Sequence, residues 1–204
     1  MISRIFLTIL LVASVIFIVE KGPAFPRQSS SHPSSSGHRL ADSMQAKLDH
    51  IQQNGEKTQP DQTPTVMTEE EVNDYIAADK IQLPQGVKKL RMEGRTGVVT
   101  AFLNVDFDEI RAGQKSANPM LSVFSGRHDV RVEGNAAGSG GQGRVHVREV
   151  SIDGFSVPNV ALEYFVNKYI TPKYPNVGID SQFHLPNRVD LASIGYHKLT
   201  VTQK

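Results

Sequence analysis

Ser125, His128 and Asp129 place the three side chains of a nucleophilic triad close together in the sequence. In hydrolases built on such a triad, the members come from separate segments and meet through the fold. The nucleophile often stands on a sharp turn between a strand and a helix. The residues around Ser125 lack that turn motif. The segment therefore favours an ordinary strand over an active site, and we predict that the protein is not an enzyme.

The glycine-rich stretch from Gly134 to Gly143, GNAAGSGGQG, has the composition of a phosphate-binding loop. Such a loop presents its amides at the start of a helix and is followed by a Lys-Ser or Lys-Thr pair. Here Arg144-Val145-His146-Val147 follows, an alternating pattern that is typical of a strand. We therefore predict a β-hairpin with a glycine loop over 138–143, and no cofactor.

Asn104, Asp106 and Asp108 lie on one face of a predicted strand, with Glu109 beyond, so their oxygens could contact a calcium ion. The ligand pattern of a calcium-binding loop does not surround them, which favours a solvated strand end. The seven histidines are scattered, without the helical spacing of a zinc-binding motif. The sequence therefore predicts no metal site.

Lys88, Lys89, Arg91 and Arg95 form the one basic cluster of a chain whose formal net charge is only +1. That small charge argues against nucleic acid as a partner. The cluster could contact lipid headgroups or phosphate, or it could be a solvated strand edge whose charges discourage strand pairing. The absence of cysteine excludes disulfides, thiolate metal sites and thiol nucleophiles.

An apolar segment, IFLTILLVASVIFIV from Ile5 to Val19, follows Arg4 near the start of the sequence. A helix of this length reaches ~22 Å, somewhat short of a ~30 Å hydrocarbon core, and flanking residues could extend it. We expect residues 1–22 to form a transmembrane signal-anchor or, alternatively, a cleaved signal peptide. The rest of the chain is then either a single-pass protein on the periplasmic side of the cell membrane, or secreted.

A Ser- and Pro-rich linker is predicted over 23–64, interrupted by a short amphipathic helix at 40–53. Leu40, Met44, Leu48 and Ile51 form one narrow apolar stripe on that helix. The stripe fits a helix laid on a domain surface; a membrane-surface helix or a coiled-coil seam are the alternatives. The folded domain is predicted to occupy 65–204.

The domain is predicted to begin with a helix that carries a capping box. Thr68 caps the first turn, Glu71 reaches back to it, and Met67 and Val72 occupy the staple positions. Antiparallel strands follow, and they do not alternate regularly with helices, which argues against a parallel nucleotide-binding sheet. One long strand is predicted over 97–110, with an apolar face made of Val99, Ala101, Leu103, Val105 and Phe107.

The segment from Val150 to Ile170 predicts a strand, a turn ending at Pro158 and a helix over 158–171 that is apolar on almost every side. Such a helix has to be embedded. We therefore expect an α+β domain in which a strongly curved antiparallel β-sheet wraps this long apolar helix. An incomplete wrap would leave an apolar groove for a lipid-like ligand, and a complete one would close the core. The residues expected to line the groove are Leu162, Phe165, Val166 and Tyr169, with Leu103, Val105 and Phe107 across the gap.

These motifs resemble those of bacterial envelope proteins of the YpmS-like and LmeA-like type. The resemblance rests on Thr68, Glu69, Glu71, Val72 and Asn73 at the first helix, on Ile152, Gly154, Phe155, Val157 and Pro158 before the second, and on Leu185 and Pro186. It covers roughly residues 65–204. It implies half of a tubular, BPI-like lipid-binding domain, in which an apolar slot holds acyl chains, and it supplies no catalytic residues.

From these observations we expect a membrane-tethered, extracytoplasmic domain that binds a lipid or other amphipathic ligand in the groove between helix 158–171 and the sheet. The alternative is an envelope interaction or scaffold module with a closed core. In that case a protein partner would bind an exposed edge strand or the 40–53 helix.

Overall fold

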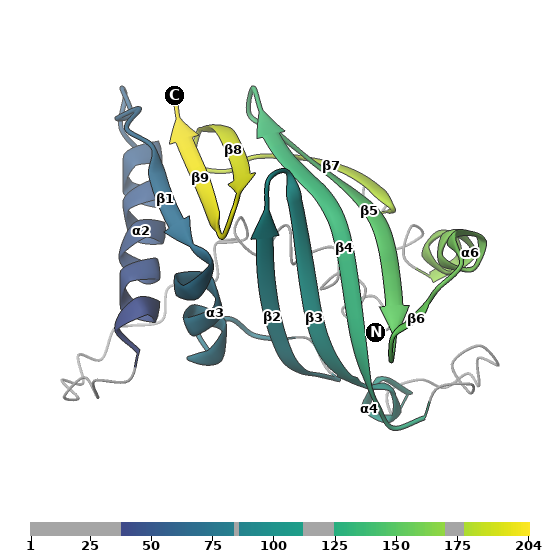
Figure 1. The fold of residues 1–204 in the computed structure, drawn as a ribbon. Helices are drawn as coiled ribbons and strands as arrows, with labels where there is room; N and C mark the ends of the chain where they lie inside the picture. Colours follow the sequence, from purple (N-terminus) through teal and green to yellow (C-terminus); the bar gives the residue numbers. More distant parts are fainter. Residues whose placement is uncertain (1–37, 84–85, 112–124, 170–177) are drawn as a thin grey trace.

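The computed structural model describes residues 38–83, 86–111, 125–169 and 178–204 (Figure 1). Thirteen elements follow one another in this part of the chain, and nine of them are strands of one antiparallel sheet. The helices are α2 (Arg39–Gly55), α3 (Glu69–Ala77), α4 (Phe107–Arg111) and α6 (Asn159–Tyr169). The strands are β1 (Thr65–Thr68), β2 (Val87–Arg95), β3 (Val98–Asp106), β4 (Arg127–Ser139), β5 (Gln142–Ile152), β6 (Phe155–Ser156), β7 (Asp180–His184), β8 (Val189–Gly195) and β9 (Lys198–Gln203).

The sheet branches at its longest strand, β4. One path runs β1-β9-β8-β4-β3-β2, and β5 pairs with β4 on the other side and carries β6 and β7. The β4–β5 hairpin confirms the one predicted from the glycine-rich stretch. Its turn is tight: Ser139 pairs with Gln142, and Gly140 and Gly141 have φ angles of +60° and +74°, which glycine adopts without strain.

The alternation predicted for the strand over 97–110 holds in β3, but the strand ends at Asp106, and Phe107 belongs to the short helix α4 instead. Ala101, Leu103 and Val105 are buried, while Phe102 and Asn104 on the opposite face are only partly buried. The inward side chains of β2 to β5 form one core cluster, which Leu162 and Val166 of α6 join. A second cluster lies between α2 and strands β1, β8 and β9, so two adjoining cores hold the sheet.

The predicted capping box at α3 is present. Thr68 Oγ1 accepts from the Glu71 amide at 3.2 Å, and Glu71 Oε2 accepts from the Thr68 amide at 2.8 Å. α3 also covers the open edge of β2. The Asn73 side chain donates to the Met92 carbonyl and accepts from the Met92 amide, both at 2.8 Å, as a neighbouring strand would. A side chain therefore satisfies an edge that could otherwise pair with another chain.

α2 extends the predicted 40–53 helix by one or two residues at each end and packs on α3, β1 and β9. Ala41, Met44 and Ile51 are buried, so this side of its stripe faces the sheet. Glu71 ties the two helices together, because it accepts hydrogen bonds from Ser43 Oγ and Lys47 Nζ, each at 2.6 Å. The apolar stripe of α2 is thus largely occupied within the fold.

The fold class expected from the sequence is wrong in its central feature. α6 is 11 residues long and lies beside β5 at one end of an open, mostly β structure, so no sheet wraps it (Figure 1). Val160 is 80% exposed and Tyr164 is 49% exposed, whereas Leu162 and Val166 are buried. A helix that is apolar on nearly every side does not have to be enclosed: here only one of its sides finds the sheet.

The membrane helix expected over 1–22 has no counterpart among the described helices. None of the helices within residues 38–204 for which the structure gives a position is both long and apolar enough to cross a bilayer. The predicted segment itself lies outside the described residues.

A candidate ligand-binding trough on the outer face of the sheet

An irregularity in β2 sets which side chains reach the outer face of the sheet, the face opposite the core. The pairing of β2 with β3 slips between Val87 and Lys89, which leaves Lys88 as an extra residue. Because of this slip, Val87 and Leu90 both point into the core although three positions separate them. Beyond the slip the strand is regular, so Lys89 and Arg91, two positions apart, lie on the outer face, while Lys88 forms an ion pair with Glu109 of α4.

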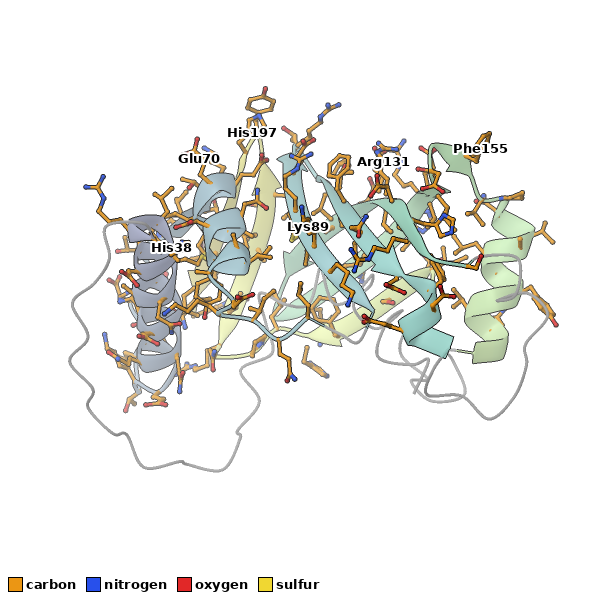
Figure 2. The ribbon with its side chains drawn as sticks, turned by 90° about the horizontal axis from the view of Figure 1, so that it is seen from below. His38, Glu70, Lys89, Arg131, Phe155 and His197 are labelled. Atoms are coloured by element: carbon orange, nitrogen blue, oxygen red, sulfur yellow. The ribbon has the colours of Figure 1, made fainter. Side chains whose placement is uncertain are left out.

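A row of cationic and aromatic side chains crosses this outer face. Arg91 on β2 pairs with Phe102 on β3, which pairs with Arg131 on β4, so Phe102 lies between two arginines across the strands. The Arg91 guanidinium carbon is 4.4 Å from the Phe102 ring centroid, within the range of a cation–π contact. Figure 2 shows the side chains, with Arg131 labelled.

Carboxylates in the neighbouring row of the sheet form ion pairs with both arginines and orient them. Arg91 Nη1 is 2.5 Å from Glu93 Oε1. Arg131 donates to Glu133 at 2.5 Å and to Glu149 at 3.3 Å. Hydrogen bonds from Ser156 and Arg131, in that order of effect, hold the pKa of Glu149 below its usual value, so Glu149 remains an anion beside Arg131.

The row lies in a trough of about 760 Å³ that is open to solvent. Ala77, Asp79 and Leu83, from the end of α3 and the loop after it, form one wall, and Ser151 and Gly154 at the β5–β6 turn form the other. Four basic side chains (Lys88, Lys89, Arg91 and Arg131) and two acidic ones (Asp79 and Asp129) line it. Positive charge is therefore concentrated here in a chain that is almost neutral as a whole.

Lys89 differs from the other cations of the trough. Lys88, Arg91 and Arg131 each have a carboxylate partner, but Lys89 forms no ion pair with any of the residues whose positions are given. Across the strands it faces Asn104, whose amide donates to Asp129 at 2.8 Å. The Lys89 ammonium is thus a hydrated cation that could bind an anion without first giving up another partner.

The groove residues expected from the sequence do not line this trough as a group. Leu162, Val166, Leu103 and Val105 are at most 6% exposed and belong to the same core cluster, against which Phe107 packs partly buried. Leu103 alone also borders the trough. A ligand could reach the whole set only if α6 moved. The side chains of Phe165 and Tyr169 lie outside the described part of the structure.

Of two other hollows, one lies near the expected groove and one lies away from α6. One, of about 450 Å³, separates α6 from β5 and β7, and most of its lining is polar: His146, Arg148, Asn159, Glu163, Asn167, Gly178 and Asp180, beside Val147, Val166 and Ile179. The other is apolar and internal, between the two cores, but its volume is only about 50 Å³. Ligand pockets usually measure some 300–1,000 Å³, so the internal hollow is too small for an acyl chain.

The structure does not assemble Ser125, His128 and Asp129 into a triad. His128 Nδ1 donates to Asp153 at 2.5 Å, its Nε2 donates to the backbone carbonyl of Ser125 at 3.2 Å, and Asp129 instead accepts from Asn104. The hydrogen bond to Asp153 is the main reason that the pKa of His128 is raised, and the Ser125 carbonyl adds to it. Since both ring nitrogens face acceptors, the ring is not placed to take a proton from Ser125.

The oxygen-bearing side chains near the end of β3 also have structural partners. Asp106 Oδ1 accepts from the amides of Asp108 and Glu109 at the start of α4, and its Oδ2 accepts from Arg127. The hydrogen bond that the backbone amide of Glu109 donates is the main reason that the pKa of Asp106 is lowered. Within the described residues, no three His, Asp or Glu side chains are grouped closely enough to hold a metal ion.

No protein-family model, curated protein or solved structure matches the chain. The site therefore has to be interpreted from its own geometry. Sequence reasoning found the basic cluster at Lys88–Arg95 but missed Phe102 and Arg131. The alternation of β3 puts Phe102 on the face opposite the core, but only the register of the strands shows that Arg91 and Arg131 lie on either side of it.

Proposed function

We propose that the chain is a non-enzymatic, extracytoplasmic domain that binds an amphipathic ligand with an anionic headgroup, such as an acidic phospholipid, in the trough on the outer face of the sheet. The apolar segment Ile5–Val19 would keep the domain near a cell membrane, or direct its secretion if it is cleaved. The trough replaces the groove between helix and sheet as the binding site that we favour.

One observation carries this proposal: Phe102 is flanked by Arg91 and Arg131 on an open surface that also holds Lys89, which has no ion-pair partner in the described part of the chain. Guanidinium and ammonium groups bind phosphate oxygens, the first through two parallel hydrogen bonds. The phenyl ring and the nearby Leu83 offer apolar surface to the part of the ligand that follows its headgroup. A volume of about 760 Å³ fits a headgroup with the first carbons of its chains.

The mixed charge of the face argues against a polyanion. Glu93, Glu133 and Glu149 border the cationic row, so a long nucleic acid strand would meet repulsion as soon as it left the trough. A single phosphate needs only Lys89 and one neighbouring guanidinium, such as that of Arg91 two positions along β2. The geometry thus supports a ligand with one localised anionic group.

Calorimetric titration of the full chain in a nonionic detergent tests the proposal. The ligands are dihexanoyl phosphatidylglycerol, dihexanoyl phosphatidylcholine as the zwitterionic control, and inorganic phosphate as a free anion. We expect phosphatidylglycerol to bind about tenfold or more tightly than phosphatidylcholine. Lys89→Gln should weaken its binding by about five- to tenfold, since one such cation contributes on the order of 1 kcal/mol at a lipid surface. Phe102→Ser should weaken binding of the lipid more than that of phosphate.

Lys57→Gln is the matched control, because Lys57 is an exposed lysine on the loop after α2, far from the trough in the sequence and in the fold. Equal binding of the two lipids, together with equal effects of the Lys57 and Lys89 substitutions, would refute the proposal. Phosphate that binds as tightly as phosphatidylglycerol would show that the site takes free anions and that the lipid assignment is wrong.

A further inference from the structure

Three large apolar side chains are exposed at the α6 end of the molecule. Phe155 on β6 and Val160 on α6 are each 80% exposed, and Tyr164 is 49% exposed. Val160 and Tyr164 are one helical turn apart and share a face, opposite the buried Leu162 and Val166. Phe155, Val160 and Tyr164 are called the α6 patch below.

The α6 patch is a local concentration. Among the residues that the structure describes, seven large hydrophobic side chains are exposed, and three of them fall between positions 155 and 164. The other four are spread over four elements or turns: Leu40 on α2, Val66 on β1, Leu191 on β8 and Tyr196 at the β8–β9 turn. Scattered exposed hydrophobic residues are normal, whereas a cluster marks a surface for binding.

The α6 patch is continuous with the trough. Gly154 lines the trough, and the next residue, Phe155, belongs to the patch. A tight turn at Asp153 and Gly154, with φ angles of +51° and +83°, makes this connection. Figure 2 shows Phe155 beside α6, at the opposite end of the molecule from His38 and α2.

We infer that the α6 patch inserts into the interfacial region of a lipid bilayer and holds the mouth of the trough at the level of the headgroups. This inference rests on the proposed function, and it adds the surface from which the ligand is taken. Aromatic side chains with an apolar body, Phe and Tyr here, are suited to the boundary between headgroups and acyl chains. The residues between Val19 and His38 could span at most roughly 60 Å, which leaves the domain free to turn its α6 end toward the membrane.

The absence of cysteine allows a direct test, because a single introduced cysteine is the only labelling site. The full chain carrying Asn159→Cys is labelled with an environment-sensitive fluorophore and reconstituted into vesicles of phosphatidylcholine and phosphatidylglycerol (3:1). Some of the lipids carry a quencher at a known depth. Asn159 is exposed and adjoins the patch without belonging to it. Gln52→Cys, exposed on α2 at the other end, is the matched control.

We expect lipid quenchers to remove at least half of the fluorescence at position 159 and less than a tenth at position 52. Adding Phe155→Ser should lower the fraction of docked molecules about fivefold, because removing a phenyl group that inserts into the bilayer weakens membrane partitioning by roughly that factor or more. Tyr196→Ser, which removes an exposed aromatic ring from the β8–β9 turn, should have no effect. Circular dichroism confirms that each variant is folded, which we expect because these side chains are largely exposed.

Equal quenching at positions 159 and 52, or none at 159, would overturn the inference. Energy transfer between labelled copies without lipid quenching would also overturn it, since the patch would then bind a second copy of the chain. Vesicles of phosphatidylcholine alone separate this inference from the proposed function. Quenching at position 159 should persist there, because the α6 patch needs no anionic lipid, whereas the titration with phosphatidylglycerol tests the trough, so either can fail without the other.

Discussion

Replacing Asn54 with alanine should destabilise the domain far more than replacing any exposed amide of α2. The Asn54 side chain is 1% exposed, near the C-terminal end of α2. Its amide donates to the Asp61 carbonyl at 2.8 Å and to Gln203 Oε1 at 2.9 Å, and its oxygen accepts from the Asp61 amide at 2.8 Å. Gln203 in turn donates to the carbonyls of Ile51 and Asn187. These bonds join the end of α2 to the last strand of the sheet.

The expected loss can be estimated from the surroundings of each bond. Asp61 is exposed, so water replaces the two bonds that Asn54→Ala removes from its backbone, at a cost of about 0.5–1 kcal/mol each. Gln203 is 4% exposed, and its oxygen would lose a partner that water cannot easily replace, at a cost of about 1–2 kcal/mol. The total of about 2–4 kcal/mol corresponds to a fall in Tm of roughly 5–12 °C for a domain of this size.

Thermal unfolding followed by far-UV circular dichroism measures this loss. Gln52→Ala, two positions earlier and exposed, is the control and should shift Tm by no more than about 2 °C. Gln203→Ala should be comparably destabilising, and the double variant should lose less than the sum of the two, because the residues share a hydrogen bond. A Tm for Asn54→Ala within 2 °C of the control would show that the buried amide does not stabilise this junction, and strictly additive losses would show that the hydrogen bond between Asn54 and Gln203 contributes nothing.

Three further predictions concern a buried acid, a close backbone approach and a histidine. Burial alone would raise the pKa of Glu71, but hydrogen bonds from Lys47, Ser43 and the Thr68 amide outweigh it and lower that pKa from its ordinary value of 4.5. Its stabilising effect is therefore complete above the unfolded-state pKa and is lost as the pH falls through the lower folded-state pKa, so Glu71→Gln should flatten the decline of Tm below about pH 5. Gly55→Ala would place a Cβ 2.4 Å from the Asn187 carbonyl oxygen and should cost about 1–3 kcal/mol in urea unfolding. The hydrogen bond to Asp153 is the main cause of the raised pKa of His128, so an NMR titration of Asp153→Asn should show this pKa fall toward its usual value. In the wild type, any stabilisation by this exposed pair is present at low pH and fades as the pH rises through the raised pKa of His128.

Local signals in the sequence were enough to predict several elements. The capping box at Thr68 and Glu71, the glycine turn of the β4–β5 hairpin and the alternation of β3 each depend on residues that are near one another in the chain. The apolar stripe likewise located α2 to within one or two residues. In all of these cases the chemistry that fixes the backbone is contained within one element or one turn.

Features that depend on contacts between distant segments could not be predicted. The α6 segment is apolar on nearly every side, but this pattern does not say which sides are buried against the sheet, and Val160 and Tyr164 remain 80% and 49% exposed. Asn54 begins a polar stretch that resembles linker, yet it is buried because Gln203, at the far end of the chain, is its partner. The row of Arg91, Phe102 and Arg131 likewise exists only through the register of three strands.

The walls and the floor of the trough are held by different parts of the fold. The wall at the β5–β6 turn is held by two hydrogen bonds to Asp153, which accepts from the Asp129 amide at 2.9 Å and from His128. The opposite wall follows from α3, which Asn73 fastens to the edge of β2. Lys89 takes part in neither set of contacts, and its only contribution to folding is its place in β2.

Binding and stability should therefore be separable in this protein. A side chain that points into an open trough and forms no ion pair contributes little to the free energy of unfolding, since exposed charges seldom contribute more than about 1 kcal/mol even when paired. The irregularity in β2 serves the core, because it lets Val87 and Leu90 both point inward, and Lys89 and Arg91 would share a face in a regular strand as well. Lys89→Gln should therefore leave Tm within about 2 °C of the wild type in thermal unfolding, so that any loss of anion binding in this variant reports on the trough and not on the fold.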